Sequence, residues 1–347
     1  MTMNILALIA LLVSPMTNAQ DYSAERTSVD GIEVIRLTDH ARNTEVSIVP
    51  SIGNNAYEMK VNGKHVLWSP YASLRELREK PTQLGNPFLA PWANRISGDS
   101  YWANGKKYRL NPDLNNFRYG NNHLPIHGLL VYAAEWKVVE VAADSVSAHL
   151  TSRLEFWRRP DWMAQFPFAH TITTTYRLKN GTLEVETAIE NLSTEAMPLS
   201  LGYHTYYRID DAPRDDWKVH VGARDHMVLS EALVPTGERE PVVLADPQPL
   251  RDFKLDDVFA GLMHDDDGRA EFFVQGKEQK IRVLLGRKFD VGVVYAPPGR
   301  DFICFEPMVG VTNAFNLAHE GLYRDLQSIL PGGTWKESFW IVPEGFR

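Results

Sequence analysis

The sequence predicts an all-β protein whose strands pair antiparallel. Apolar and polar residues alternate with a period of two through much of the chain, as in the segment 183–190, Leu-Glu-Val-Glu-Thr-Ala-Ile-Glu. Asn-Gly pairs at 62–63 and 180–181 separate such segments, and this dipeptide is typical of tight hairpins. Helical patterns are few and short, without the strand-helix alternation that a parallel α/β sheet requires. We therefore expect a large antiparallel sandwich with a few short helices.

Six segments carry the strand pattern most clearly, and they are Glu45–Val49, Trp136–Val141, Ser145–Leu150, Thr171–Leu178, Leu183–Glu190 and Lys280–Leu285. The best helical pattern is Ala72–Glu79. The segments Pro235–Pro241 and Ala245–Pro249 are rich in turn residues and predict surface connections. The acidic run His264–Gly268 lacks the alternating ligand spacing of a calcium loop and predicts a solvated hairpin tip.

The first residues carry the pattern of an export signal. The apolar run Ile5–Val13 is too short to span a bilayer, and a small-residue cleavage site follows it at Ala19, although no Lys or Arg precedes it. We expect residues 1–19 to be removed as a signal peptide, with a buried first strand or an uncleaved anchor as the alternatives. The remaining residues 20–347 then form one domain that is periplasmic or secreted and not held at a membrane. The single Cys304 cannot form an intramolecular disulfide.

Charge and missing motifs narrow the function. The formal charge of −8 is spread along the chain without a basic cluster, which disfavours nucleic acid and acidic lipid as partners. The sequence has no phosphate-binding glycine loop, no G-x-G-x-x-G, no G-x-S-x-G and no paired-His zinc spacing. We therefore expect no cofactor and no metal site, and a small molecule as the partner.

Four polar residues lie in unusually apolar or turn-rich segments. They are Arg95 after a proline-stiffened stretch, His127 before a glycine, His204 inside an aromatic run, and Glu306 at the end of an apolar strand. Taken singly, a histidine in such a strand is more often a satisfied core residue, and an arginine or glutamate is as often a structural ion pair.

Together, a histidine and a glutamate fit the ring opening of a cyclic hemiacetal. One group removes the proton of the C1 hydroxyl while another protonates the ring oxygen, and the open aldehyde recloses on its other face after rotation about C1–C2. This chemistry needs no metal, nucleotide or covalent intermediate. We expect His204 and Glu306 on opposite sides of one open cleft with Arg95 at its floor.

Ordered motifs along nearly the whole chain resemble those of the aldose 1-epimerase (galactose mutarotase) family. They are Ala93-Asn-Arg-Ile96, Asp99–Leu110, Leu124-Pro-Ile-His-Gly128 and Trp136, then Leu201–Tyr207, Leu255-Asp-Asp-Val-Phe259, Phe305-Glu-Pro307, Asn313-Ala-Phe-Asn316 and Leu330-Pro-Gly-Gly333. The resemblance implies the galactose mutarotase-like β-super-sandwich and a free aldose as the substrate. It also implies site roles: Glu306 as general base, His204 as general acid, and Arg95, His127 and Asp256 as substrate-binding groups.

Some details stay open at the level of sequence. Asp256 is preferred to Asp257 because it keeps the family's spacing before the Phe. Thr205 and Tyr207 stand where the family usually has Pro and Phe, which leaves the pocket shape and the choice of sugar open.

Three aromatic side chains near these motifs have a face to offer the apolar side of a pyranose, or else belong to the core or the cleft wall. They are Trp92, Tyr203 and Tyr206.

Two other functions fit the same fold. One is a binding module that holds a carbohydrate without turning it over. The other is an enzyme acting on a modified hexose, such as an epimerase of phosphorylated sugar, or a polysaccharide lyase. An exported acidic chain without an Arg/Lys cluster fits phosphorylated sugar poorly.

Overall fold

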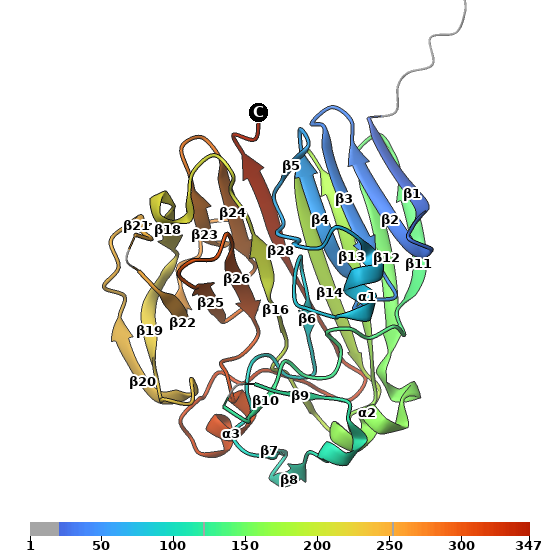
Figure 1. Cartoon of the computed structure of the whole chain (residues 1–347). Coiled ribbons are helices and arrows are strands. Elements are labelled where there is room, and N and C mark those ends of the chain that lie inside the picture. The colour runs from blue at the N-terminus through green and yellow to red at the C-terminus, as the bar shows by residue number, and fades with distance from the viewer. Residues whose placement is uncertain (1–20, 121, 252) are drawn as a thin grey trace, which may run out of the picture.

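The computed structural model describes residues 21–120, 122–251 and 253–347. The predicted signal peptide, residues 1–19, lies outside the described residues. Figure 1 shows two sheet layers, with a long nine-stranded sheet that runs across the molecule and packs against a smaller sheet at one end and against a second large sheet at the other. Every pairing between named strands is antiparallel, which confirms the predicted all-β sandwich.

The nine-stranded sheet has the order β11-β12-β13-β14-β28-β24-β23-β18-β21. In that order its strands are Lys137–Ala143, Ala148–Glu155, His170–Lys179, Thr182–Asn191, Thr334–Glu344, Lys280–Leu285, Ala270–Gln275, Lys218–Val221 and Gln248–Pro249. The smaller sheet, β1 to β5, comprises Tyr22–Val29, Ile32–Asp39, Thr44–Val49, Asn55–Val61 and Lys64–His65. Its strands β1 and β2 contact β11, β12 and β13, so that these two sheets form one half of the sandwich.

The eight-stranded sheet positions the candidate site. Its path is β20-β19-β22-β25-β26-β16-β6, with β17 also paired to β26. In that order the strands are Pro235–Pro241, Ala223–Leu229, Leu255–Leu262, Val291–Ala296, Ile303–Met308, Gly202–Tyr203 and Phe88–Leu89, and β17 is Thr205–Tyr207. Phe305 of β26 packs on Phe272 of the nine-stranded sheet, with the ring centroids 6.1 Å apart. The opposite face of β26 is therefore free to carry the site.

Short pairs and helices complete the chain. The pairs are β7 with β8 (Ser100–Ala103, Lys106–Arg109), β9 with β10 (Arg118–Tyr119, Pro125–Ile126) and β15 with β27 (Met197–Pro198, Ser328–Ile329). The three α-helices of the described residues are α1 Leu74–Glu79, α2 Pro160–Gln165 and α3 Ala314–His319, and single 3₁₀ turns lie at Pro112–Leu114, Phe156–Arg158 and Arg214–Asp216. In the described part of the chain no helix combines the length and apolarity needed to cross a bilayer.

Local sequence rules account for most of these elements. β14 buries Leu183, Val185 and Thr187 on one face, as the alternation predicts. Both predicted Asn-Gly hairpins are present: Asn180 and Gly181 join β13 to β14, and Asn62 and Gly63 join β4 to β5, all four with positive φ.

Two predicted elements begin two or more residues later than expected. The helix predicted from Ala72 begins at Leu74 because the hydroxyl of Ser73 accepts the Glu76 N–H at 3.2 Å and caps the first turn. The strand predicted from Ser145 begins at Ala148. There the Asp144 carboxylate accepts the Val146 and Ser147 N–H groups at 2.7 and 2.8 Å and holds a turn.

The prediction of a loop at Pro235–Pro241 was wrong, because this segment is β20, the exposed edge strand of the eight-stranded sheet. Prolines are tolerated at a sheet edge, where a missing N–H breaks no ladder. The acidic run 264–268 forms a tight turn closed by the antiparallel bridge between His264 and Ala270: Gly268 N–H donates to Asp265 O at 2.9 Å, and Asp265 N–H donates to Arg269 O at 3.0 Å. This turn joins β22 of the eight-stranded sheet to β23 of the nine-stranded sheet rather than two paired strands.

Candidate active site

Two neighbouring strands bring His204 and Glu306 together at the bottom of a cleft. Glu306 lies in the interior of β26, not at the strand end expected from the sequence, and it pairs with Val293 of β25. Because side chains alternate, Phe305 enters the sandwich core while Glu306 points to the opposite face. His204 lies between β16 and β17, and its N–H donates to Pro87 O at 3.0 Å.

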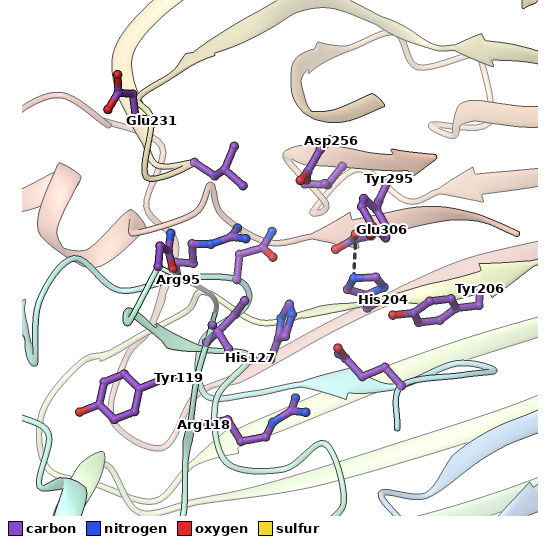
Figure 2. A pocket seen from close by; sticks show the side chains of 17 residues that line it. Arg95, Arg118, Tyr119, His127, His204, Tyr206, Glu231, Asp256, Tyr295 and Glu306 are labelled. Atoms are coloured by element: carbon purple, nitrogen blue, oxygen red, sulfur yellow. Dashed lines mark ion pairs between the residues drawn. The ribbon is translucent and has the colours of Figure 1, made fainter. Parts of the chain in front are cut away.

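The two side chains contact each other directly. His204 Nε2 lies 3.2 Å from Glu306 Oε1, and the residues are only 7% and 2% exposed. Figure 2 shows this contact at the base of the pocket. The expectation that they flank the cleft from opposite sides was therefore wrong. The reason lies in the sheet: β17 pairs antiparallel with β26, and Thr205 lies opposite Phe305, so the adjoining residues His204 and Glu306 come side by side.

Burial drives both members of the pair toward their neutral forms. It lowers the pKa of His204 to about 3, assisted by the charges of Arg118 and Arg95. Burial, reinforced by the charge of Asp256, raises the pKa of Glu306 well above its ordinary value, and Arg95 opposes that shift. The pair therefore holds a single proton over a wide pH range, within transfer distance of both atoms.

Arg95 and Asp256 extend the cleft on the other side of Glu306. Asp256 lies on β22 opposite Tyr295 of β25. Burial raises the pKa of Asp256, and the charge of Arg95 opposes this increase. Burial lowers the pKa of Arg95, and the charges of Asp256 and Glu306 oppose this decrease. The neighbouring Asp257 contacts His226 instead, with Oδ1 2.9 Å from Nε2.

His127 completes the set in an unusual backbone conformation. Its φ is 62°, in the left-handed region, and its N–H donates to Asn94 O at 2.9 Å. The ring meets that of His204 edge-on, with the centroids 5.4 Å apart. Burial holds the pKa of His127 well below its ordinary value, so that it is a neutral hydrogen-bonding group. Nδ1 of His127 has no protein partner among the described residues.

The aromatic neighbours divide between cleft and core. Tyr206 lines the cleft and stacks on the His204 ring, with centroids 4.8 Å apart. Trp92 and Tyr203 are buried in the main core and offer no face to a ligand. Thr205 and Tyr207 also lie outside the cleft lining: the Thr205 hydroxyl donates to Asn86 Oδ1 at 2.6 Å, and Tyr207 packs on Phe305. These departures therefore act on the core rather than on the pocket shape.

All five sequence-predicted site residues line one cleft of about 470 Å³, a size typical of small-ligand sites. The sequence did not predict its other lining residues, which are Gln83, Asn94, Arg118, Tyr119, Gly120, Asn122, Ile126, Glu231, Leu233, Val293 and Tyr295. Their only sequence signals are the polar, turn-rich run 115–122 and the alternation that places Val293 and Tyr295 on one face of β25. No group of three or more His, Cys, Asp or Glu residues in the described ranges is arranged to hold a metal ion.

Comparison with known proteins identifies the family. The sequence profile of the family described as aldose 1-epimerase matches residues 33–341, nearly the whole described chain. The chain belongs to the aldose 1-epimerase family. In Escherichia coli K12 it is similar to the uncharacterised protein YihR, with 27% identity over 188 residues, 54% of this chain but only 55% of YihR. The uncharacterised protein YphB of the same organism is 25% identical over 263 residues, 70% of this chain and 78% of YphB.

Solved structures of this family share the fold. A galactose mutarotase-like protein of Clostridium acetobutylicum has a TM-score of 0.83 and 20% identity, covering 94% of this chain and 100% of its own. A galactose 1-epimerase of Lactobacillus acidophilus has a TM-score of 0.70 and 14% identity, covering 94% and 99%. These likenesses show the galactose mutarotase-like β-sandwich.

Two family motifs lie outside the cleft lining, and the first of them supports the cleft. Asn313 N–H donates to Arg95 O at 2.9 Å, and Asn313 Oδ1 accepts from Ser97 N–H at 3.0 Å and Asn316 Nδ2 at 2.8 Å. This motif therefore fixes the backbone around Arg95. In Leu330–Gly333, the Gly332 N–H donates to Asn191 O, and Gly333 O accepts the Asn191 N–H, which braces the end of β14 away from the cleft.

Proposed function

We propose that this protein interconverts the α and β anomers of a free aldose, with Glu306 as general base and His204 as general acid. The observation that carries the proposal is the buried contact of 3.2 Å between His204 Nε2 and Glu306 Oε1 in a cleft that also contains Arg95, His127 and Asp256. An acid and a base at this separation serve two oxygens on one carbon.

The reaction balances on one proton. The Glu306 carboxylate takes the C1 hydroxyl proton, the C1=O bond forms as the bond between C1 and the ring oxygen breaks, and imidazolium His204 protonates that oxygen. Rotation about C1–C2 presents the other face of the aldehyde. The same steps then run backward, so that Glu306 and His204 regain their starting forms. The proton shared by Glu306 and His204 changes position during the reaction, but the two residues together hold the same number of protons before and after each step.

Substrate-binding groups hold the ring during these steps. Arg95 and Asp256 carry opposite charges in the partly buried wall, where they suit hydrogen bonds to sugar hydroxyls. Neutral His127 has an unpartnered Nδ1 among the described residues and is available to a further hydroxyl. The positive charge of Arg95 also favours the ionised form of Glu306 that the first step requires.

The test is anomer exchange measured by NMR on freshly dissolved aldoses. We expect wild-type protein to accelerate exchange of at least one common aldose, and Glu306→Gln to remove nearly all of that acceleration because an amide cannot accept the proton. Glu238→Gln, the same change at an exposed site on β20, is the control. Sugar binding without any exchange would instead identify a carbohydrate-binding module.

We also propose that the protein is exported. The proposal rests on the apolar run Ile5–Val13 and the small residues that end at Ala19. Sequencing the N-terminus of the mature protein from its native host should begin at Gln20. A mature chain that retains Met1 would exclude a cleaved signal.

A further inference from the structure

The two nitrogens of the His204 ring differ in their polar contacts. Nε2 lies 3.2 Å from Glu306 Oε1, whereas Nδ1 is buried and has no hydrogen-bond partner among the described residues. Many reactive imidazoles are oriented by a hydrogen bond at the nitrogen that does not react. In this cleft a single contact fixes one atom of the ring but not its plane. Packing against neighbouring side chains must therefore hold the plane of the His204 ring.

The Tyr206 side chain packs flat against the His204 ring. The ring centroids are 4.8 Å apart with 15° between the planes, and Figure 2 shows the two rings side by side. His204 directly precedes β17, and residues two apart in an extended strand point to the same face. The rings of His127 and Tyr295 meet the His204 ring at steep angles, 83° and 73°. Tyr206 is therefore the aromatic neighbour that lies parallel to the imidazole and sets its plane.

Trp68 limits the movement of Tyr206. Their rings stack with centroids 5.6 Å apart and 28° between the planes. Phe302 packs against both rings, with its centroid 4.7 Å from that of Trp68 and 5.1 Å from that of Tyr206. Tyr206 thus has stacked contacts with Trp68 and with His204. Loss of the Trp68 ring would leave space into which Tyr206 and the imidazole could move together.

Hydrogen bonds hold Trp68 itself in place. Its main-chain N–H donates to Tyr206 O at 3.0 Å, and its carbonyl accepts the Gly85 N–H at 3.0 Å. The indole Nε1 donates to Asp301 Oδ1 at 2.9 Å. Trp68 is half-buried and is not among the described residues that line the cleft, so it does not touch a sugar there. An effect of its side chain on the reaction therefore reaches His204 through Tyr206.

We propose that Trp68 is a positioning residue that holds the His204 imidazole in its reactive orientation through Tyr206. This inference rests on the proposed function. In that reaction His204 protonates the ring oxygen only as the bond between C1 and this oxygen breaks, whereas other groups of the cleft hold the sugar beforehand. A misplaced imidazole thus slows proton transfer without weakening the binding of the substrate. Trp68 should therefore act on kcat and not on KM.

The first test removes the ring at position 68. Trp68→Met fills part of the space with a flexible apolar side chain and has no ring to stack. We expect kcat for anomer exchange to fall about 10- to 100-fold, as displacement of a reacting group by about 1 Å does, with KM within about twofold of wild type. Trp68→Phe keeps a ring but loses the hydrogen bond to Asp301, and it should recover most of the lost kcat.

The matched control is Trp340→Met, which makes the same change at another half-buried tryptophan, on β28 and outside the cleft lining. It should keep both kcat and KM. Urea unfolding of each variant identifies conditions in which the protein is folded during the assay. Unchanged kcat in folded Trp68→Met, or a Trp68→Phe protein as slow as Trp68→Met, overturns this inference while wild-type exchange upholds the proposed function. A wild-type protein that exchanges no aldose rejects the proposed function itself.

The second test asks whether the effect passes through Tyr206. Tyr206→Leu removes the ring between Trp68 and His204, and it should itself lower kcat. If Trp68 acts through this ring, adding Trp68→Met to Tyr206→Leu should change kcat by less than about twofold, because the two losses are then not additive. A further loss as large as that in Trp68→Met alone would show that Trp68 acts by another route and would overturn the assignment.

Discussion

Replacing Gly128 by alanine tests how the fold holds the cleft wall. Gly128 follows His127 and has a φ of +65°, which costs a residue with a Cβ about 1–2 kcal/mol. A Cβ at this position would also overlap the carbonyl of Ala90 and approach Pro91 N to 3.0 Å. Backbone atoms cannot rotate away, and relief of such overlap costs about 1–3 kcal/mol. We expect Gly128→Ala to lower the free energy of unfolding by about 2–5 kcal/mol.

Two other glycines separate the cost of the left-handed backbone conformation from the cost of the close contact. Gly63 has a φ of +76° and no atom within 4 Å of the position that a Cβ would take, so Gly63→Ala reports the backbone conformation alone. Gly202 does not have a positive φ, but a Cβ there would meet Met308 Cγ at 2.7 Å and Pro307 O at 2.8 Å. Gly202→Ala therefore reports close contact alone, on β16 beside β26, the strand that carries Glu306.

Urea unfolding followed by tryptophan fluorescence measures all three variants. Gly128→Ala should have the lowest midpoint, and its loss should approach the sum of the two control losses. It should also raise KM for the sugar, because the shift displaces the adjacent His127. A Gly128→Ala protein as stable as Gly63→Ala would refute the contact argument. Unchanged KM despite lost stability would separate His127 from substrate binding.

Three further outcomes follow from the same geometry. In a pH profile measured by NMR, kcat/KM should stay constant while the His204–Glu306 pair holds one proton. It should decrease at pH values below the His204 pKa of about 3 and at pH values above the raised pKa of Glu306. An inflection near pH 6.5 would contradict this expectation. Glu306 binds its proton more tightly in the folded protein than in the unfolded chain, so the wild-type protein loses stability as the pH rises above the ordinary Glu pKa of 4.5. In urea unfolding at neutral pH, Glu306→Gln should therefore be more stable than wild type. The difference should grow by about 1.4 kcal/mol per pH unit until the pKa of Glu306 in the folded protein is reached. Asn313→Ala removes the acceptor of Ser97 N–H and Asn316 Nδ2 and should cost about 2–4 kcal/mol in urea unfolding and raise KM, whereas Asn313→Asp, which keeps an acceptor, should lose less.

Local rules made much of the fold predictable. The alternation in 183–190 and the Asn-Gly turns depend only on neighbouring residues, and both appear as predicted in β14 and its hairpin with β13. The edge strand β20 was missed because its prolines favour loops locally. β20 pairs with β19 across the short loop 230–234, where Ser230 N–H donates to Val234 O at 2.9 Å, but this loop contains no Gly, Asn or Pro that would indicate a hairpin turn in the sequence.

The candidate site likewise has residues that the local sequence indicates and residues that it does not. His204, Glu306 and Arg95 can be found in the sequence because a polar side chain in an apolar segment must have a hydrogen-bond partner or a ligand. The structure places all three in one cleft. The rim does not stand out in the sequence. Asn122 Nδ2 donates to Ala232 O at 2.7 Å, so residues 110 positions apart meet at the rim beside Leu233. Their meeting depends on how the β9–β10 pair packs beside the eight-stranded sheet, which a single sequence does not encode locally.

The backbone around the cleft explains how its side chains stay available to a ligand. Asn94, His127 and Asn313 all have left-handed conformations, with φ of 51°, 62° and 63°. Each such conformation in a residue other than glycine costs about 1–3 kcal/mol and persists only where its surroundings fix it. Here main-chain hydrogen bonds fix it: His127 N–H donates to Asn94 O, and Asn313 N–H donates to Arg95 O, both at 2.9 Å. The backbone therefore sets the direction of the His127 ring and of the Arg95 guanidinium, and neither needs a side-chain hydrogen bond to hold it. Among the described residues, His127 Nδ1 and Arg95 Nε have no hydrogen-bond partner. Strain in the main chain thus keeps hydrogen-bonding capacity free at the place where a sugar hydroxyl would bind.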